Sequence, residues 1–154
     1  MLQHTSRILL AAALTLGGLA HAQVQVQDAW VRATTAQQKA TGAFMQLTAA
    51  QDMRLVGISS PAAAVAEVHT MEMEGNVMKM RPMAALDLPA GKPVQLAPGG
   101  LHIMLQDLHQ QVQPGSVVPL TLELEDKDGK RQSLQVEAAA RALGAAKPAD
   151  AAMH

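Results

Sequence analysis

The sequence has 154 residues, 49% hydrophobic and 16% charged, so the chain is apolar enough to bury a core and too apolar to be intrinsically disordered. Its 12 basic and 13 acidic residues give a net charge of −1, and it has one Trp, one Phe and no Tyr. This charge and this shortage of stacking aromatic rings argue against nucleic acid as a partner. Ten Met and no Cys exclude thiol catalysis, disulfides and Cys-based zinc or iron–sulfur sites.

The first 22 residues have the features of a secretory signal peptide. A short amino-terminal region ends at Arg7, an apolar run follows from Ile8 to Leu19, and Ala20-His21-Ala22 is a small-x-small cleavage site. The apolar run is shorter than the roughly 20 residues that span a bilayer. We therefore expect cleavage after Ala22, export to a bacterial periplasm and no stable membrane insertion afterwards. Because the chain has no Cys to carry a lipid, we expect the exported form to be soluble.

Beyond Gln23 the hydrophobic pattern has period two, and the apolar stretches are separated by Gly, Pro, Asp and Asn turns. Turns are predicted at Glu74-Gly75-Asn76 and at Asp126–Gly129, and Pro98-Gly99-Gly100 interrupts the chain before another strand. This pattern predicts an all-β domain, an antiparallel two-sheet sandwich with Greek-key connections. The predicted strands are Val24–Arg32, Gly42–Thr48, Arg54–Ser59, Ala66–Met73, Val77–Pro82, Pro93–Leu96, Leu101–Gln106, Val118–Glu125 and Arg131–Glu137.

The carboxyl-terminal residues 144–154 show no periodic pattern and are expected to form a flexible tail. The tail ends in Met153-His154, a pair that could capture a metal ion transiently, although a frayed terminus is the simpler interpretation. The predicted organisation is therefore a cleaved signal at 1–22, one β-sandwich domain at 23–143 and a tail at 144–154.

Methionine is concentrated in one short segment. Five of the nine Met residues that follow the signal lie between positions 71 and 83, namely Met71, Met73, Met78, Met80 and Met83. Strand alternation places Met71 and Met73 on one face, and Met78 and Met80 on one face of the next strand, so two Met ladders meet on a hairpin. Met also fills gaps in ordinary cores, and this alternative stays open for part of the cluster.

The strand that starts at Leu101 carries the more specific signal. Leu101, Ile103 and Leu105 form one apolar face suited to the core, so His102 and Met104 must point the other way. His69 lies on another predicted strand and shares a face with Met71. A His and a Met that project together from the outer side of a buried strand are difficult to explain by packing and suit a bound metal.

The residue types favour Cu(I) over other metals. Thioether and imidazole ligands are neutral, and thioether sulfur prefers Cu(I) to harder cations. Two His and two Met would hold Cu(I) with a net charge of +1 and would disfavour Cu(II). Zinc is a poorer match, because structural zinc sites are usually rich in Cys. Met thioethers also resist oxidation better than Cys thiolates do, which suits an oxidising compartment.

The spacing of four residues resembles the motif of the periplasmic copper chaperone family PCu(A)C. His69 is followed after ten residues by Met80, then after twenty-one by His102, and after one more by Met104. The strings VHTMEMEGNVMKMRPM, LPAGKPVQLAPGGLHIML and VPLTLELED are similar to that family, as is DAWVRAT followed by TGAFMQLT. The resemblance covers about residues 24–138.

The resemblance implies a cupredoxin-like antiparallel β-sandwich that binds one Cu(I) per chain at the surface through His69, Met80, His102 and Met104. It also implies copper delivery to the dinuclear copper centre of a respiratory cytochrome c oxidase, with the copper-bearing oxidase subunit and a Sco-type thioredoxin-fold protein as partners. Met71, Met73, Met78 and Met83 match no ligand position; they either shield the site and assist copper transfer or only pack. His109 receives no role and is expected to be exposed.

Other functions explain the residues less well. An electron-transfer cupredoxin needs a Cys thiolate, which this chain lacks. An enzyme is not expected, because the four Ser residues after the signal lie in no nucleophile elbow. The strongest alternative is a periplasmic copper storage or resistance protein that binds Cu(I) without serving an oxidase. A metal-free interaction module is the weakest alternative.

Overall fold

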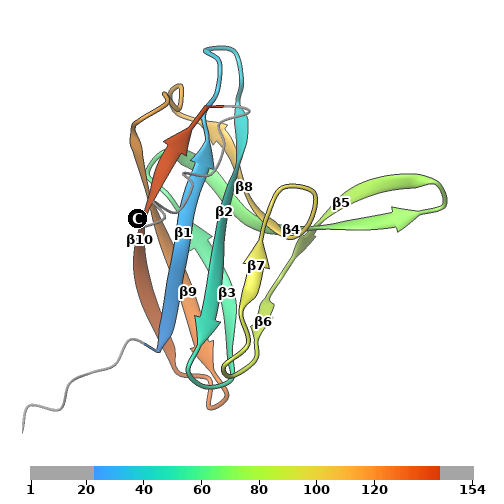
Figure 1. Ribbon diagram of the computed structural model, residues 1–154, viewed down its shortest axis with the longest axis vertical. Coiled ribbons are helices and arrows are strands. Elements are labelled where there is room, and N and C mark those ends of the chain that lie inside the picture. The colour runs from blue at the N-terminus through green and yellow to red at the C-terminus, as the bar shows by residue number, and fades with distance from the viewer. Residues whose placement is uncertain (1–22, 143–154) are drawn as a thin grey trace, which may run out of the picture.

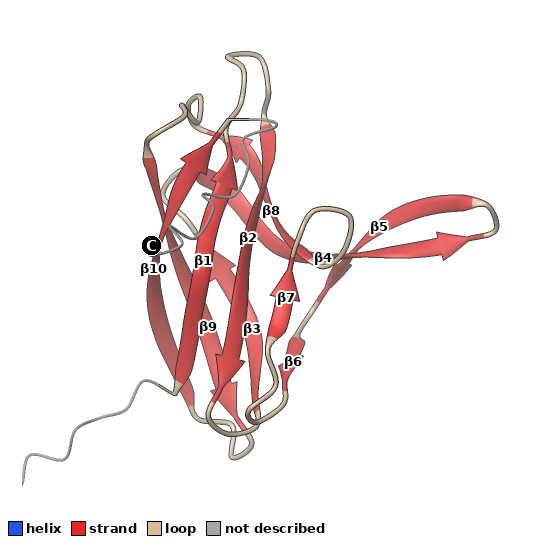
Figure 2. Ribbon diagram, viewed as in Figure 1, coloured by secondary structure: helices blue, strands red, loops and turns tan. Residues whose placement is uncertain are grey.

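The computed structural model describes residues 23–142, which form ten β-strands (Figures 1 and 2). The predicted signal at 1–22 and the tail at 144–154, with Met153-His154, lie outside these residues. No helix in this part of the chain is long and apolar enough to cross a membrane. The strands are β1 (Val24–Arg32), β2 (Ala40–Ala49), β3 (Met53–Ser59), β4 (Ala63–Glu74), β5 (Val77–Met83), β6 (Leu86–Leu88), β7 (Val94–Leu96), β8 (His102–Leu108), β9 (Val117–Asp126) and β10 (Arg131–Arg141).

The strands pair in the order β5-β4-β8-β2-β1-β10-β9-β3-β6, with β7 added to β2. The sheet curls until β3 comes close to β4, which gives two packed layers (Figure 1). All pairs are antiparallel except β1 and β10, which pair in parallel from Trp30↔Ala139 to Arg32↔Arg141. These two strands come from opposite ends of the domain, so no hairpin forces them to run in opposite directions. The architecture confirms the predicted all-β, cupredoxin-like sandwich.

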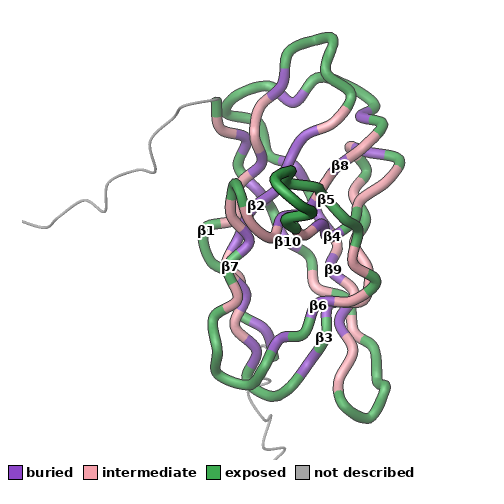
Figure 3. The backbone as a smooth tube through the Cα atoms, turned by 90° about the vertical axis from the view of Figure 1, so that its right-hand side faces the viewer, coloured by how far each residue is buried: buried purple, intermediate pink, exposed green. Residues whose placement is uncertain are grey.

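Strand alternation builds the core between the layers. In β9, the inward-facing Val118, Leu120, Leu122 and Leu124 are buried, and their neighbours in sequence are more exposed. Leu47 of β2, Leu55 of β3 and Leu105 of β8 join them in the same apolar cluster. Figure 3 shows the alternation of buried and exposed positions along the backbone.

All nine predicted strands are present, with ends that differ by up to four residues. One further strand, β6, was not predicted, because Leu86–Leu88 is too short to show an alternating pattern. Both predicted hairpin turns are confirmed: Gly75 (φ 65°) and Gly129 (φ 79°) take the left-handed conformation that favours glycine. In the second turn, Asp126 Oδ1 accepts hydrogen bonds from the backbone N–H groups of Asp128 and Lys130, each 2.9 Å long.

The hairpin of β4 and β5 extends away from the sandwich (Figure 1). The inner part of β4 pairs with β8 as far as His69↔His102. From Thr70 to Glu74, β4 pairs only with β5. We call the two-stranded segment Thr70–Arg81 the hairpin arm. Figure 3, which looks onto its tip, shows it as largely exposed.

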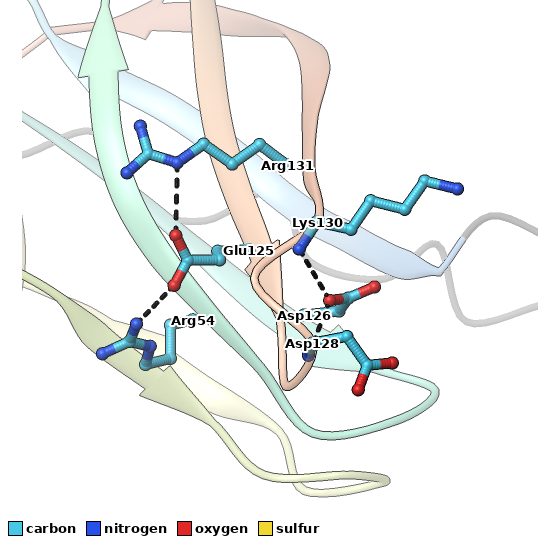
Figure 4. A network of polar contacts seen from close by, with 6 residues as sticks. All are labelled: Arg54, Glu125, Asp126, Asp128, Lys130 and Arg131. Carbon is cyan, nitrogen blue, oxygen red and sulfur yellow. Dashed lines mark hydrogen bonds and ion pairs between the residues drawn. The ribbon is translucent and has the colours of Figure 1, made fainter.

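Another polar feature lies where β9 turns into β10 (Figure 4). The carboxylate of Glu125 accepts a hydrogen bond from Arg54 on β3 and another, 3.2 Å long, from Nε of Arg131 on β10. The Arg54 guanidinium, and after it Arg131, hold the pKa of Glu125 below its usual value. The cluster connects three neighbouring strands, β10, β9 and β3, near the end of the sandwich where β9 turns into β10 (Figures 1 and 4).

Candidate metal centre

The four predicted ligands lie on three neighbouring strands, β5, β4 and β8. His69 is directly opposite His102 in the β4–β8 pair, and Met80 is directly opposite Met71 in the β4–β5 pair. Residues opposite one another in a sheet share a face, as do residues two apart along a strand. His69, Met80, His102 and Met104 therefore project from the same face of the sheet, as the sequence alternation requires.

The predicted split of the β8 strand is confirmed. Ile103 and Leu105 are fully buried in the core, and His102 and Met104 point to the opposite face. His102 is less accessible than predicted for a surface ligand, because only 7% of the residue is exposed. The ring of Phe44 on β2 lies next to it, with ring centroids 6.5 Å apart.

The structure leaves one ring nitrogen of His102 free to bind a metal. Nδ1 of His102 lies 2.8 Å from the backbone carbonyl of Gly100. A carbonyl oxygen can only accept a hydrogen bond, so Nδ1 carries the hydrogen atom and is the donor. In the neutral ring Nε2 then holds the lone pair, which is the form that binds a metal.

His69 is fixed in the complementary way. Its Nε2 lies 3.0 Å from Oε2 of Glu67, and the carboxylate accepts the hydrogen bond. Nδ1 of His69 is buried and has no hydrogen-bond partner, the only such side-chain nitrogen or oxygen among residues 23–142. A buried polar atom without a partner is costly, which makes it a candidate for metal coordination. The two imidazole centroids are 5.9 Å apart.

A surface pocket of about 330 Å³ adjoins the His102 ring. His102, Met104 and Met80 line it, together with Met71 and Phe44. His69 does not line this pocket and is only 8% exposed. The pocket thus brings together three of the four predicted ligands, and the fourth is the cross-strand neighbour of His102.

The two thioethers differ in access to solvent. Met80 is 49% exposed, because it projects from the base of the hairpin arm, and Met104 is partly buried. Two imidazoles and two thioethers form a neutral ligand set suited to a soft monovalent ion. Within residues 23–142, no group of three or more His, Asp or Glu side chains could hold a harder metal.

Phe44 depends on Gly42, two residues earlier on β2. A Cβ at position 42 would lie 2.7 Å from Cζ of the Phe44 ring, closer than real Cβ atoms approach other heavy atoms. Gly42 is also the cross-strand partner of Met104. The ring of Trp30 packs against the ring of Phe44, with centroids 4.5 Å apart and planes tilted by 37°. The absence of a side chain at Gly42 thus seats the aromatic ring that packs beside His102.

Sequence reasoning missed Glu67, Phe44 and Gly42 as supporting residues. Glu67 could have been found, since it lies two residues before His69 and therefore on the same strand face. The contact between Phe44 and His102 joins residues far apart in sequence and has no local signal.

The structure also separates the roles of the other methionines. Met83 is opposite Val68, on the other face of β5, and packs against the core. Met73 and Met78 are exposed and fill no core gap. His109 is exposed, as expected, and its Nδ1 lies 3.0 Å from the carbonyl of Pro61.

Comparison with known proteins places these features in a family. The sequence matches the model of the LpqE-like family, described as "Putative lipoprotein LpqE-like", over residues 24–138. The protein named "Putative lipoprotein Lxx21020" from Leifsonia xyli subsp. xyli is 34% identical over 104 residues. That alignment covers 67% of this chain and 63% of the relative, so the chain spans somewhat less than two thirds of that protein.

Solved structures show the same fold. The copper-bound PCuAC domain from PmoF2 has a TM-score of 0.63 and 23% identity, over 79% of this chain and 95% of that chain. Apo-DR1885 from Deinococcus radiodurans has a TM-score of 0.59 and 31% identity, over 93% and 95%. Its CuI form has a TM-score of 0.58 and 30% identity, over 84% and 85%.

The fold is therefore that of the PCuAC domains, with a His and Met face on three neighbouring strands. Because the family model covers most of the sequence, the chain belongs to the LpqE-like family.

Proposed function

We propose that this protein is a periplasmic Cu(I) metallochaperone that binds one ion tightly through His69, Met80, His102 and Met104. The observation that carries the proposal is the buried Nδ1 of His69, which has no hydrogen-bond partner and lies on the face that also presents His102 and the two thioethers. The printed name CuI-DR1885 of a structural neighbour 30% identical to this chain supports copper as the ion. Copper is the cargo of such a protein, not a resident cofactor.

The proposed transfer is an exchange of ligands without a change of oxidation state. Met80 is half exposed, so a Cys or His of an acceptor can approach the ion from that side and displace a thioether. The two histidines, held by Glu67 and Gly100, keep the ion bound while the exchange proceeds. Phe44, Met71 and Pro98 form an apolar part of the pocket lining, beside polar residues such as Arg32 and Gln38, and this apolar part limits the access of water to the ion.

We propose the dinuclear copper centre of a respiratory cytochrome c oxidase as the destination, with a Sco-type protein acting on the same centre. The resemblance of the ligand spacing to the PCu(A)C chaperones supports this destination. The printed names of the family and of its Leifsonia relative contain the word lipoprotein, which supports export to the cell envelope. A copper storage or resistance protein is the second candidate, because three further methionines, Met71, Met73 and Met78, lie on the same face of the hairpin arm as Met80.

An anaerobic Cu(I) titration of residues 23–154 against a competing chelator tests the proposal. We expect one tightly bound equivalent, which the double variant Met80→Leu/Met104→Leu loses. The matched control is Met83→Leu, because Met83 lies on the other face of β5 and packs against the core. Tight binding that survives the double variant would contradict the site.

A transfer assay separates the two candidate functions. The Cu(I)-loaded protein is mixed with the soluble copper domain of an oxidase subunit or with a Sco-type protein, and copper is measured in each after separation. A chaperone passes its equivalent to an acceptor. Several tight equivalents per chain, with none transferred, would identify a storage protein instead.

A further inference from the structure

The hairpin arm carries a second group of thioethers outside the four-residue site. Met73 and Met78 are directly opposite each other near the tip, and Met71 and Met80 form the next pair inward on the same face. Met73 is 63% exposed and Met78 is 48% exposed. Exposed Met residues at two adjacent cross-strand positions contribute nothing to the core, so packing does not account for them.

The geometry of an antiparallel pair allows these sulfurs to converge. Directly opposed residues have Cβ atoms about 4.5–5.5 Å apart. Met has three rotatable bonds between Cα and its methyl group, so two opposed thioethers can reach one ion. Met71 lies two residues from Met73 on the same face and also lines the pocket with His102 and Met104. It can therefore contribute to either location.

The charged residues of the arm lie on its other face. Arg81 pairs with Glu74 at 2.7 Å and with Glu72 at 3.2 Å, and Lys79 pairs with Glu74 at 2.9 Å. These four residues alternate with the methionines along both strands, so their side chains point away from the thioether face. The ligands that the arm presents on its Met face are thioethers, which select soft ions.

We infer that Met73 and Met78, with Met71, form a second and weaker site for a soft monovalent ion, Cu(I) or Ag(I). The site contains only neutral thioethers and no imidazole, so it holds the ion less tightly than the four-residue site does. This arm site holds a copper ion at the tip of the arm. The ion either waits there before it moves inward through Met71 and Met80, or reaches the tip after it leaves the four-residue site. The inference deepens the proposed function and rests on it for the direction of transfer.

Nuclear magnetic resonance of the methionine methyl groups tests the inference. Residues 23–154, labelled with ¹³C at the Met methyls, are titrated with Ag(I) nitrate in a chloride-free buffer. We expect the methyl signals of Met80 and Met104 to shift with the first equivalent and those of Met73 and Met78 with the second. The variant Met73→Leu/Met78→Leu should lose the second step and keep the first, and Met83→Leu should keep both.

The two steps distinguish failure of this inference from failure of the proposed function. If the Met73 and Met78 signals stay in place at a several-fold excess of Ag(I), the arm site is refuted, while the first step still supports the four-residue site. If Met73 and Met78 respond and Met80 and Met104 do not, the arm site stands and the four-residue site is refuted.

Discussion

At the scale of single residues, the site depends on which nitrogen of each histidine carries a proton. Gly100 fixes His102 through Nδ1, and Glu67 fixes His69 through Nε2. Each ring therefore offers one lone pair, but through different nitrogens. Hydrogen bonds of this kind orient metal-binding histidines and make them better ligands.

Replacement of Glu67 should weaken metal binding without unfolding the protein. The Glu67 side chain is 45% exposed, and its carboxylate accepts the hydrogen bond from His69 Nε2. We expect Glu67→Ala to lower the Cu(I) affinity by about 10–100-fold, the usual effect of losing such a supporting group. Glu67→Gln should recover part of the loss, because its amide oxygen still accepts. Chelator competition measures both, and equal affinities of Glu67→Ala and the parent would show that Glu67 does not position His69.

At the scale of elements, the sheet brings the ligands together through the register of β4 with β5 and β8. Much of this arrangement could be predicted from the sequence. The alternation in Leu101–Leu105 placed His102 and Met104 on the outer face, and the Gly75 turn set the register that faces the Met pairs of the arm. The pairing of β4 with β8 could not be predicted, because these strands are distant in sequence and nothing local specifies their contact.

The substitution Gly42→Ala should damage the site from the neighbouring strand. The added Cβ would collide with the Phe44 ring, which packs beside His102. Overpacking of this kind costs about 1–3 kcal/mol of stability, and a displaced ring should also weaken Cu(I) binding. Gly57→Ala is the matched control, since a Cβ there meets Glu123 at 3.4 Å, an ordinary contact. Urea unfolding of the metal-free proteins measures the free energy of unfolding. If Gly42→Ala and Gly57→Ala lost equal amounts of it, the proposed role of Gly42 in seating the Phe44 ring would be refuted.

At the scale of the whole molecule, the candidate metal site and the Glu125 cluster lie on different strands of the sandwich. The candidate ligands are on β4, β5 and β8, and the Glu125 cluster is on β3, β9 and β10. The strand pattern was sufficient to predict the fold class, because alternating residues in strands such as β9 and β10 already specify a buried face. The parallel pairing of β1 with β10 and the ion pair of Glu125 with Arg54 join strands that are distant in sequence, which local sequence does not describe. Arg131, in contrast, lies directly opposite Glu125 across the β9–β10 hairpin.

The Glu125 cluster predicts how stability changes with pH. Arg54 and Arg131 lower the pKa of Glu125 in the folded state, so the folded state favours the ionised carboxylate. This stabilisation is complete above the unfolded glutamate pKa of about 4.3 and is lost as the pH falls through the lower folded value. Glu125→Gln should therefore be less stable than the parent at neutral pH, with a difference that shrinks in acid. Glu137→Gln, an exposed position, is the control. A difference that does not depend on pH would contradict the assignment.

The measurement that tests the central claim most directly is X-ray absorption at the copper edge of the protein loaded anaerobically with one equivalent of Cu(I). The structure predicts a first shell of two nitrogen and two sulfur ligands, from His69, His102, Met80 and Met104. The variant Met80→Leu/Met104→Leu should lose both sulfur ligands, and Met83→Leu should leave them in place. A shell of nitrogen and oxygen alone, or sulfur ligands that persist in the double variant, would contradict the site.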